Sequence, residues 1–233
     1  MNKNKFYEAF AALILVKADV IKESFNNSWL KDRPDLQIGD LGIEVTEAIS
    51  TKQGEQRFFQ QEILDCKTVD DANKLPITTT PKNRNRVIQI ENTPYFFVST
   101  GLEKADEKET SNLIVSRIRM KNKMFKDYPD LLRFRERWVF VFVEDVFSAL
   151  FPVDFQCIKA EIGNSDFDGA FVMLNHDLLI IKNGVDKEVV CSLNERDFLE
   201  LSVEASRIIG ASDIKKKEEF LEKYKKMKKD NSN

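Results

Sequence analysis

Histidine, cysteine and glycine are scarce in this chain of 233 residues. The one histidine, His176, excludes zinc hydrolases that need two or three imidazole ligands, and no GxSxG motif accompanies it. Three widely spaced cysteines (Cys66, Cys157 and Cys191) predict neither a disulfide framework nor a CxxC metal site. The eight glycines form no GxxxxGK[ST] or GxGxxG loop. Any enzymatic chemistry must therefore use carboxylates, lysines and hydroxyls.

Long apolar runs are also absent. The longest, residues 9–16, falls short of the roughly 18 residues that cross a bilayer. Lys and Arg total 36 against 39 Asp and Glu, and this near balance predicts no general attraction to polyanions. The composition is that of a globular protein, and we expect a cytoplasmic protein without membrane contact.

Periodicity predicts an α/β fold. Apolar residues at helical spacing predict helices over 5–25, 107–126 and 195–209, and a less regular helix over 51–75. The segment WVFVFV, residues 138–143, is apolar on both faces, which is typical of a central strand covered on both sides. Further strands are expected at 35–38, 41–47, 87–90, 95–99, 156–162, 171–174, 178–181 and 189–191.

The first two strands carry the chemistry. Asp35 begins one strand and Glu44 lies in the middle of the next, with Gly39-Asp40 as the hairpin turn between them. Opposed residues of a hairpin lie roughly 5 Å apart, so the two acids can reach one metal ion. Mg²⁺ or Mn²⁺ favours such oxygen ligands, and the carbonyl of Val45 would add a third.

A first helix is followed by a strand with Pro34-Asp35, a strand with Glu44-Val45-Thr46, a helix and the central strand. The order of these elements resembles that of the PD-(D/E)xK nuclease superfamily over roughly residues 5–145. The resemblance implies a restriction-endonuclease-like αβββαβ core and a metal-dependent nuclease (an endonuclease of DNA, or second RNA, such as those used in defence). Asp35 and Glu44 would be the metal ligands. The family has lysine where this chain has Thr46, which either binds water at the metal or marks an inactive site.

Lys121 can replace the missing lysine. It continues the apolar stripe of Ile114, Ile118 and Phe125 on the helix 107–126, and burying an ammonium there is costly unless it is paired. Some members of the superfamily have moved the catalytic lysine to this helix. The alternative is that Lys121 lies at the edge of the stripe and extends its amine into water.

Other residues have simpler alternatives. Glu8 resembles an acid that several superfamily members place beside the metal, or is a surface glutamate. Asp40 is either a metal ligand or, more simply, a turn residue, and Glu47 is expected on the opposite face from Thr46. Gln60 and Gln61 either contact phosphate or are solvated. A basic surface is expected from Arg84, Arg86, Arg117, Arg119, Lys121, Lys123, Lys126, Arg133, Arg135 and Arg137.

We expect residues 1–145 to form the nuclease-like core, residues 146–210 a C-terminal extension of the same domain, and residues 211–233 a basic helical tail that frays. The extension would serve substrate choice, a homodimer contact or a partner subunit. Two alternatives stay open. One is a nuclease-like fold without catalysis that binds nucleic acid or protein, and the other is an unrelated α/β domain in which Asp35 and Glu44 are surface acids.

Overall fold

The computed structural model describes residues 3–49, 86–89, 96–99, 107–127, 133–143, 153–185, 189–212 and 214–230. The chain divides into two units. One unit comprises Met1–Ala48 and Glu107–Asn233, and the other comprises Ile49–Asp106. Within the second unit, β3 (Arg86–Gln89) and β4 (Phe96–Ser99) form an antiparallel pair. The expected boundaries at residues 145 and 210 stay predictions.

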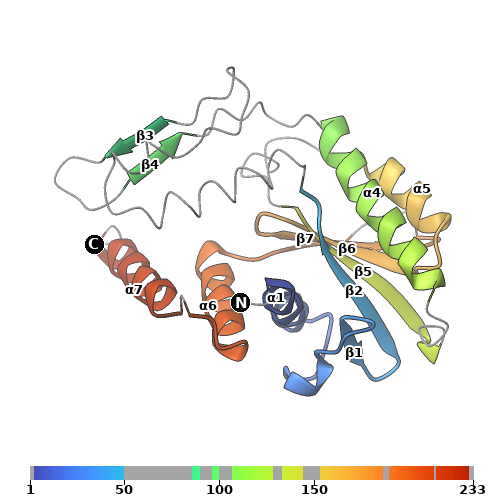
Figure 1. Cartoon of the computed structure of the whole chain (residues 1–233), viewed down its shortest axis with the longest axis horizontal. Helices are drawn as coiled ribbons and strands as arrows, with labels where there is room; N and C mark the ends of the chain where they lie inside the picture. Colours follow the sequence, from blue (N-terminus) through green and yellow to red (C-terminus); the bar gives the residue numbers. More distant parts are fainter. Residues whose placement is uncertain are drawn as a thin grey trace. The chain divides into compact units, whose positions relative to one another are not determined.

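The first unit is an α/β structure with a six-stranded mixed sheet (Figure 1). Its strand order is β1-β2-β5-β6-β7-β8, in which β5 runs parallel to β2 and β6 and the other pairs are antiparallel. The strands span β1 (Leu36–Ile38), β2 (Leu41–Glu47), β5 (Glu136–Val143), β6 (Gly169–Leu174), β7 (Asp177–Lys182) and β8 (Val189–Ser192). The predicted central strand is thus confirmed as β5.

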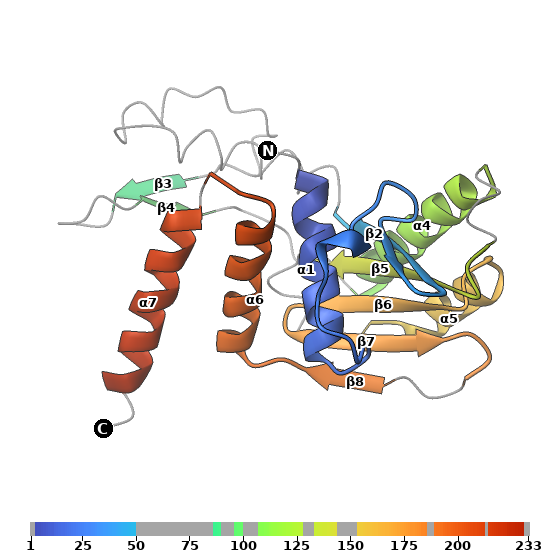
Figure 2. The same cartoon turned by 90° about the horizontal axis from the view of Figure 1, so that it is seen from below.

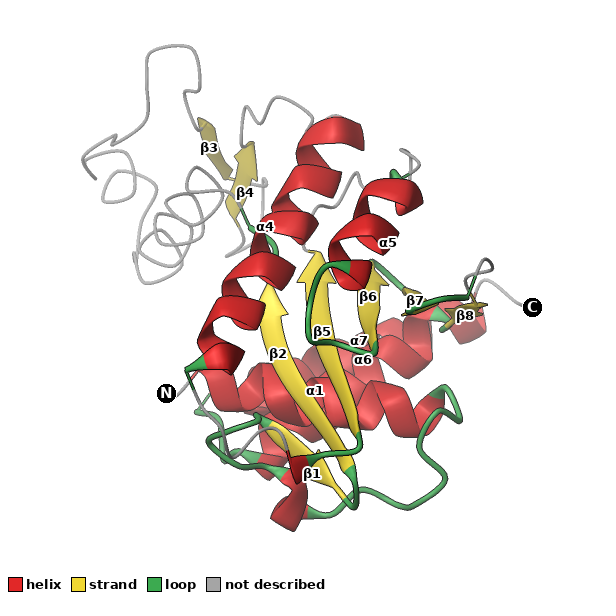
Figure 3. Ribbon diagram, turned by 90° about the vertical axis from the view of Figure 1, so that its right-hand side faces the viewer, coloured by secondary structure: helices red, strands yellow, loops and turns green. Residues whose placement is uncertain are grey.

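Helices cover both faces of this sheet. In Figure 3, α4 (Glu107–Lys126) and α5 (Phe155–Gly163) lie on the near face, and α1 (Lys3–Lys17) and α6 (Glu195–Ile208) lie on the far face. Successive residues of β5 therefore enter different cores: Val139 and Val141 pack with α4 and α5, and Phe140 and Phe142 pack with α1. This explains why β5 is apolar at every position from residue 138 to residue 143.

The helix α1 is buried almost all round. Ala9, Ala11, Ala12, Ile14 and Leu15 are fully buried. Figure 2 shows the cause, since α1 lies between the sheet and α6, with α7 (Ile214–Asp230) beyond α6. A helix apolar on every side is typical of such an inner layer.

Two expectations about secondary structure need correction. The first helix ends at Lys17 rather than residue 25, because Asp19 adopts a positive φ of 59° that interrupts helical geometry. Residues 156–162 form the helix α5 and not a strand. There, Asp154 accepts hydrogen bonds from the N–H groups of Gln156 and Cys157, and Ile158 and Ile162 are buried one turn apart.

The four strands expected before α4 are all present as β1, β2, β3 and β4. The first two belong to the six-stranded sheet, and β3 and β4 pair with each other. The helices expected at 107–126 and 195–209 are confirmed as α4 and α6, and the tail contains α7. The helix expected over 51–75 lies outside the described residues.

Candidate functional site: a carboxylate–lysine cluster

The hairpin of β1 and β2 positions both predicted acids. Asp35 directly precedes β1, and its Oδ2 accepts a hydrogen bond of 2.7 Å from the backbone N–H of Val45. Alternation along β2 directs Ile43 and Val45 into the core with α1, and Glu44 toward the opposite face, where α4 lies. The two carboxylates therefore approach each other because the hairpin register places them there.

Lys121 reaches this pair from α4. Its Nζ lies 2.7 Å from Oε2 of Glu44 and 3.1 Å from Oδ2 of Asp35. Ile114 and Ile118, which precede it on the same stripe, are fully buried. The Lys121 side chain is 13% exposed, so the ammonium points to the two carboxylates and not into water. We call Asp35, Glu44 and Lys121 the carboxylate–lysine cluster.

Two carboxylates share one ammonium in this cluster. Burial raises the pKa of Glu44. The charge of Lys121 opposes that rise, as does the weaker effect of Arg33, while the charge of Asp35 adds to it. Burial disfavours the charged form of Lys121, but the two carboxylates outweigh burial and raise its pKa above the ordinary value. Lys121 is therefore protonated at neutral pH, and it lies beside Glu44, whose ionised form is disfavoured by burial.

Glu8 adds a third acid from α1. Its side chain is 5% exposed and pairs with Lys5 across 2.9 Å between Oε2 and Nζ. Burial raises the pKa of Glu8; the ion pair with Lys5 opposes this shift, and the charge of Asp35 reinforces it. Glu8 is thus a buried acid within electrostatic reach of the cluster, not a surface glutamate.

The other predicted positions lie apart from these contacts. Thr46 is half-buried two residues beyond Glu44 on β2. Asp40 is exposed in the turn, and its backbone carbonyl accepts a hydrogen bond from the N–H of Glu136. The ring of His176 packs edge-on against Phe198 with 4.8 Å between centroids. Gln60 and Gln61 lie outside the described residues.

The basic residues differ in their partners. Arg119 forms two hydrogen bonds with the carboxylate of Glu161, and Arg137 lies 3.7 Å from that of Asp168. Arg133 instead donates to the neutral side chain of Gln37. Of the remainder, Arg84 lies outside the described residues, and the side chains of Arg86 and Lys126 are not described.

Gln37 is the residue of this region that the sequence analysis missed. Its Nε2 donates a 2.7 Å hydrogen bond to the carbonyl of Arg33, and its Oε1 accepts a 2.9 Å bond from Nη2 of Arg133. The alternation that predicts strand 35–38 already places Gln37 on the same face as Asp35. A polar residue on the same strand face as Asp35 is therefore the sequence feature that indicates a role for Gln37 near the cluster.

The donor set bears on metal binding. Among the described residues, no group of three or more Asp, Glu, His or Cys side chains is arranged to hold a metal ion. The cluster offers two carboxylates, and the carbonyl of Val45 follows Glu44 directly. Hard oxygen donors of this kind suit Mg²⁺ or Mn²⁺ rather than a soft metal.

Fold and site together define an α/β protein with a partly buried carboxylate–lysine cluster at one edge of a mixed sheet. Comparisons with family models, curated proteins and solved structures find no match to this chain. In the described part of the chain, no helix has both the length and the hydropathy needed to cross a membrane.

Proposed function

We propose that this protein is a metal-dependent phosphodiester hydrolase of the PD-(D/E)xK type that cleaves DNA, with RNA as the second candidate. The observation that carries the proposal is the position of Lys121 Nζ, within 3.1 Å of carboxylate oxygens of both Asp35 and Glu44. Asp35 lies just before β1, Glu44 lies in β2 and Lys121 lies in α4. Together they supply the two acids and the amine of that superfamily, with the amine on a helix and not on the strand of the second acid.

Asp35, Glu44 and the Val45 carbonyl would hold Mg²⁺ or Mn²⁺. The fit rests on donor chemistry, because two carboxylates already gather around one positive charge in this structure. When bound, a divalent cation supplies charge that acidifies water and stabilises phosphate oxygens. The N–H of Val45 fixes Asp35 and restricts its rotation, so the ligand is preorganised.

Lys121 has a different part in the proposal. A charged ammonium beside the two acids can donate hydrogen bonds to the attacking water or to the phosphate oxygen on which charge develops. Isoleucines buried at 114 and 118 fix the helix that carries it, so little reorganisation is needed. Glu8 would be an accessory acid near the same water, and Thr46 would contribute its hydroxyl.

The test is nicking of supercoiled plasmid with Mn²⁺ or Mg²⁺ by the wild type and three variants: Asp35→Ala, Glu44→Ala and Lys121→Gln. We expect metal-dependent nicking that falls at least a hundredfold in each variant, a loss comparable to removing one preorganised charge-stabilising group. Lys123→Gln is the matched control, since Lys123 is an exposed lysine on the same helix. Equal nicking by the wild type and Asp35→Ala would contradict the proposal.

A second candidate is a nuclease-like fold without catalysis that binds nucleic acid or protein. The specific observation in its favour is Thr46, which stands where the superfamily has lysine, while Lys121 and the acids satisfy one another. A wild-type protein that binds DNA but leaves it intact with either metal would favour this candidate.

A further inference from the structure

The hydrolase proposal leaves unused a group of side chains beside the cluster. Gln37 joins the carbonyl of Arg33, just before Asp35, to the guanidinium of Arg133. Through Gln37, Arg133 is tied to the backbone that also positions the first acid. The guanidinium is therefore placed relative to Asp35 and is not a freely moving surface charge.

A second contact fixes Arg133 from another side. Its guanidinium carbon lies 4.9 Å from the centre of the Phe134 ring. That ring fills the space above Gly42, where an added Cβ would lie 2.9 Å from Phe134 Cγ. Gly42 is the register partner of Gln37. Because Gly42 has no side chain, there is room for the Phe134 ring that supports Arg133.

The charge of Arg133 is also available. Arg119 and Arg137 lie beside carboxylates, whereas no ion pair of Arg133 is found among the described residues. Arg133 is exposed, and its hydrogen-bond partner Gln37 is neutral. Because a guanidinium has five donors, contact with Gln37 leaves others for a ligand. An arginine that keeps its charge and spare donors is suited to a phosphate group.

The spacing between Asp35 and Gln37 indicates which phosphate of a bound nucleic acid Arg133 would contact. Asp35 and Gln37 are two residues apart on one face of an extended segment, roughly 7 Å along the strand. This separation is comparable to that of neighbouring phosphates in one nucleic-acid strand. We propose that Arg133, positioned by Gln37, binds the phosphate next to the one at the carboxylate–lysine cluster. The ligand is then a polynucleotide backbone of at least two consecutive phosphates and not an isolated phosphate ester.

This inference rests on the proposed function, and a binding assay separates the two. Anisotropy of labelled 16-nucleotide DNA and RNA is measured in EDTA, where cleavage cannot occur, at several salt concentrations. For Arg133→Gln we expect about tenfold weaker binding and a salt slope reduced by about one phosphate contact. Gln37→Ala should weaken binding but keep the slope, because the charge remains. Arg133→Lys should also keep the slope.

Arg135→Gln is the matched control, because Arg135 is an exposed arginine of the same segment. Equal affinity and slope in Arg133→Gln and Arg135→Gln would overturn the inference, as would failure of the wild type to bind either oligonucleotide. A wild type that binds but never cleaves would defeat the hydrolase proposal alone, and the slope would still report on Arg133. The DNA and RNA arms identify the preferred backbone.

A second measurement uses a substrate with a single phosphodiester, bis(p-nitrophenyl) phosphate. Relative to the wild type, Arg133→Gln should lose about tenfold more of its rate on the oligonucleotide than on this small substrate, because the small substrate has no neighbouring phosphate. Equal losses on both substrates would assign Arg133 to the hydrolytic site itself and overturn the proposed second subsite.

Discussion

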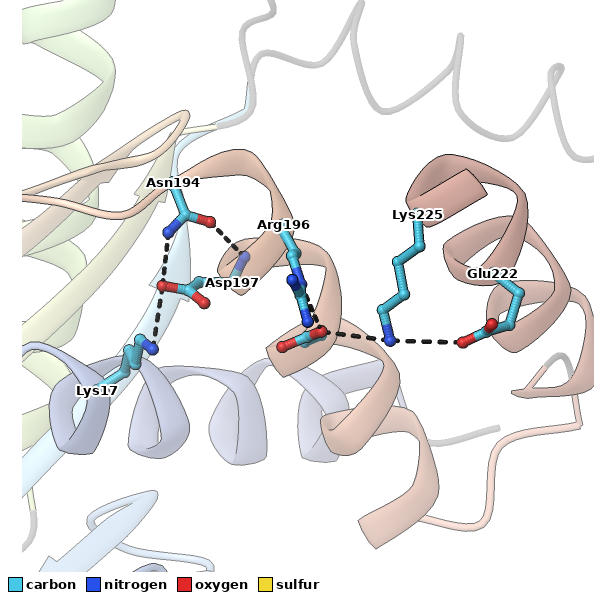
Figure 4. Close-up of polar contacts among 7 residues, drawn as sticks. Lys17, Asn194, Arg196, Asp197, Glu222 and Lys225 are labelled. Atoms are coloured by element: carbon cyan, nitrogen blue, oxygen red, sulfur yellow. Dashed lines mark hydrogen bonds and ion pairs between the residues drawn. The ribbon is translucent and has the colours of Figure 1, made fainter. Parts of the chain in front are cut away.

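Two groups of charged side chains in this protein have similar distances and different surroundings. In the carboxylate–lysine cluster, N···O distances of 2.7 and 3.1 Å join side chains that are 9–16% exposed. Between α1, α6 and α7, Lys17 lies 3.0 Å from Asp197, and Lys225 lies 3.3 Å from Glu200 (Figure 4). There the side chains are 23–45% exposed. The difference is burial, which decides how strongly each group constrains the molecule.

Water explains the contrast. At the helix surface, solvent screens the charges, and ordering two long side chains costs entropy, so each pair contributes little. In the cluster, the charges were removed from water at a cost, and each depends on the others. The apolar contacts of α7 are also few among its described residues, since Leu221 is buried whereas Phe220 is 59% exposed. We therefore expect the contacts of α7 to contribute less to the stability of the protein than those of the carboxylate–lysine cluster.

Loss of the shared ammonium should have the largest effect. Lys121→Met leaves Asp35 and Glu44 facing each other without a counter-charge, and we expect a loss of about 3 kcal/mol in the free energy of unfolding at neutral pH. Urea denaturation measures it. Lys123→Met, the exposed control on the same helix, should change stability by less than about 0.5 kcal/mol. Similar losses in both variants would show that the cluster is no more constrained than a surface pair.

Divalent cations should produce the next largest effect. If Asp35 and Glu44 are ligands, Mg²⁺ or Mn²⁺ stabilises the native state by about 2.7 kcal/mol at a concentration one hundred times its dissociation constant. Thermal unfolding of the wild type should therefore shift upward with added metal, and that of Asp35→Ala should not. In Lys121→Met, the cation should recover part of the lost stability. A shift that persists in Asp35→Ala would place the metal elsewhere.

The comparison also shows what sequence could predict. Asp35, Glu44 and Lys121 were all identified because alternation and helical periodicity are local properties, and each places a side chain on a known face. The approach of Asp35 and Glu44 follows from the hairpin of β1 and β2, which is local. The arrival of Lys121 depends instead on the packing of α4 against β2 and β5, which is a long-range contact. The sequence could suggest that contact only through the resemblance.

The errors have local causes. At residues 156–162, the N-cap Asp154 and the buried pair Ile158 and Ile162 outweigh the strand-forming residues that suggested β-structure. Beyond residue 17, the apolar Ile21 continues the helical spacing and so predicts a longer helix. The positive φ of Asp19 ends the helix, and Ile21 is buried although it lies outside the helix. The helix-surface pairs escaped prediction altogether, because charged residues on exposed faces carry no period that identifies a partner.

A larger residue at position 42 should have an intermediate effect on the free energy of unfolding. In Gly42→Ala, the new Cβ would lie 2.9 Å from both Phe134 Cγ and Pro34 Cγ, so these rings must move. Overpacking of this kind costs about 1–3 kcal/mol. Because Pro34 precedes Asp35, the shift should also weaken metal binding, which titration calorimetry measures. Gly184→Ala is a useful control, because a Cβ there meets nothing within 4 Å but is strained by its φ of 72°. It should lower stability without changing metal affinity.

The smallest effect is expected at the helix surface. Glu200→Gln removes the acceptor shared by Arg196 and Lys225, and we expect a loss of about 0.5 kcal/mol that disappears near 1 M salt. The hydrogen bond from Arg196 lowers the pKa of Glu200, with help from Lys225 and against slight desolvation. The contribution is therefore complete above the ordinary glutamate pKa and is lost as pH falls through the lowered value. Urea midpoints at low and high salt and at neutral and acid pH measure it. A loss that persists in high salt would show that α7 is held by more than screened charge, and would remove the contrast with the cluster.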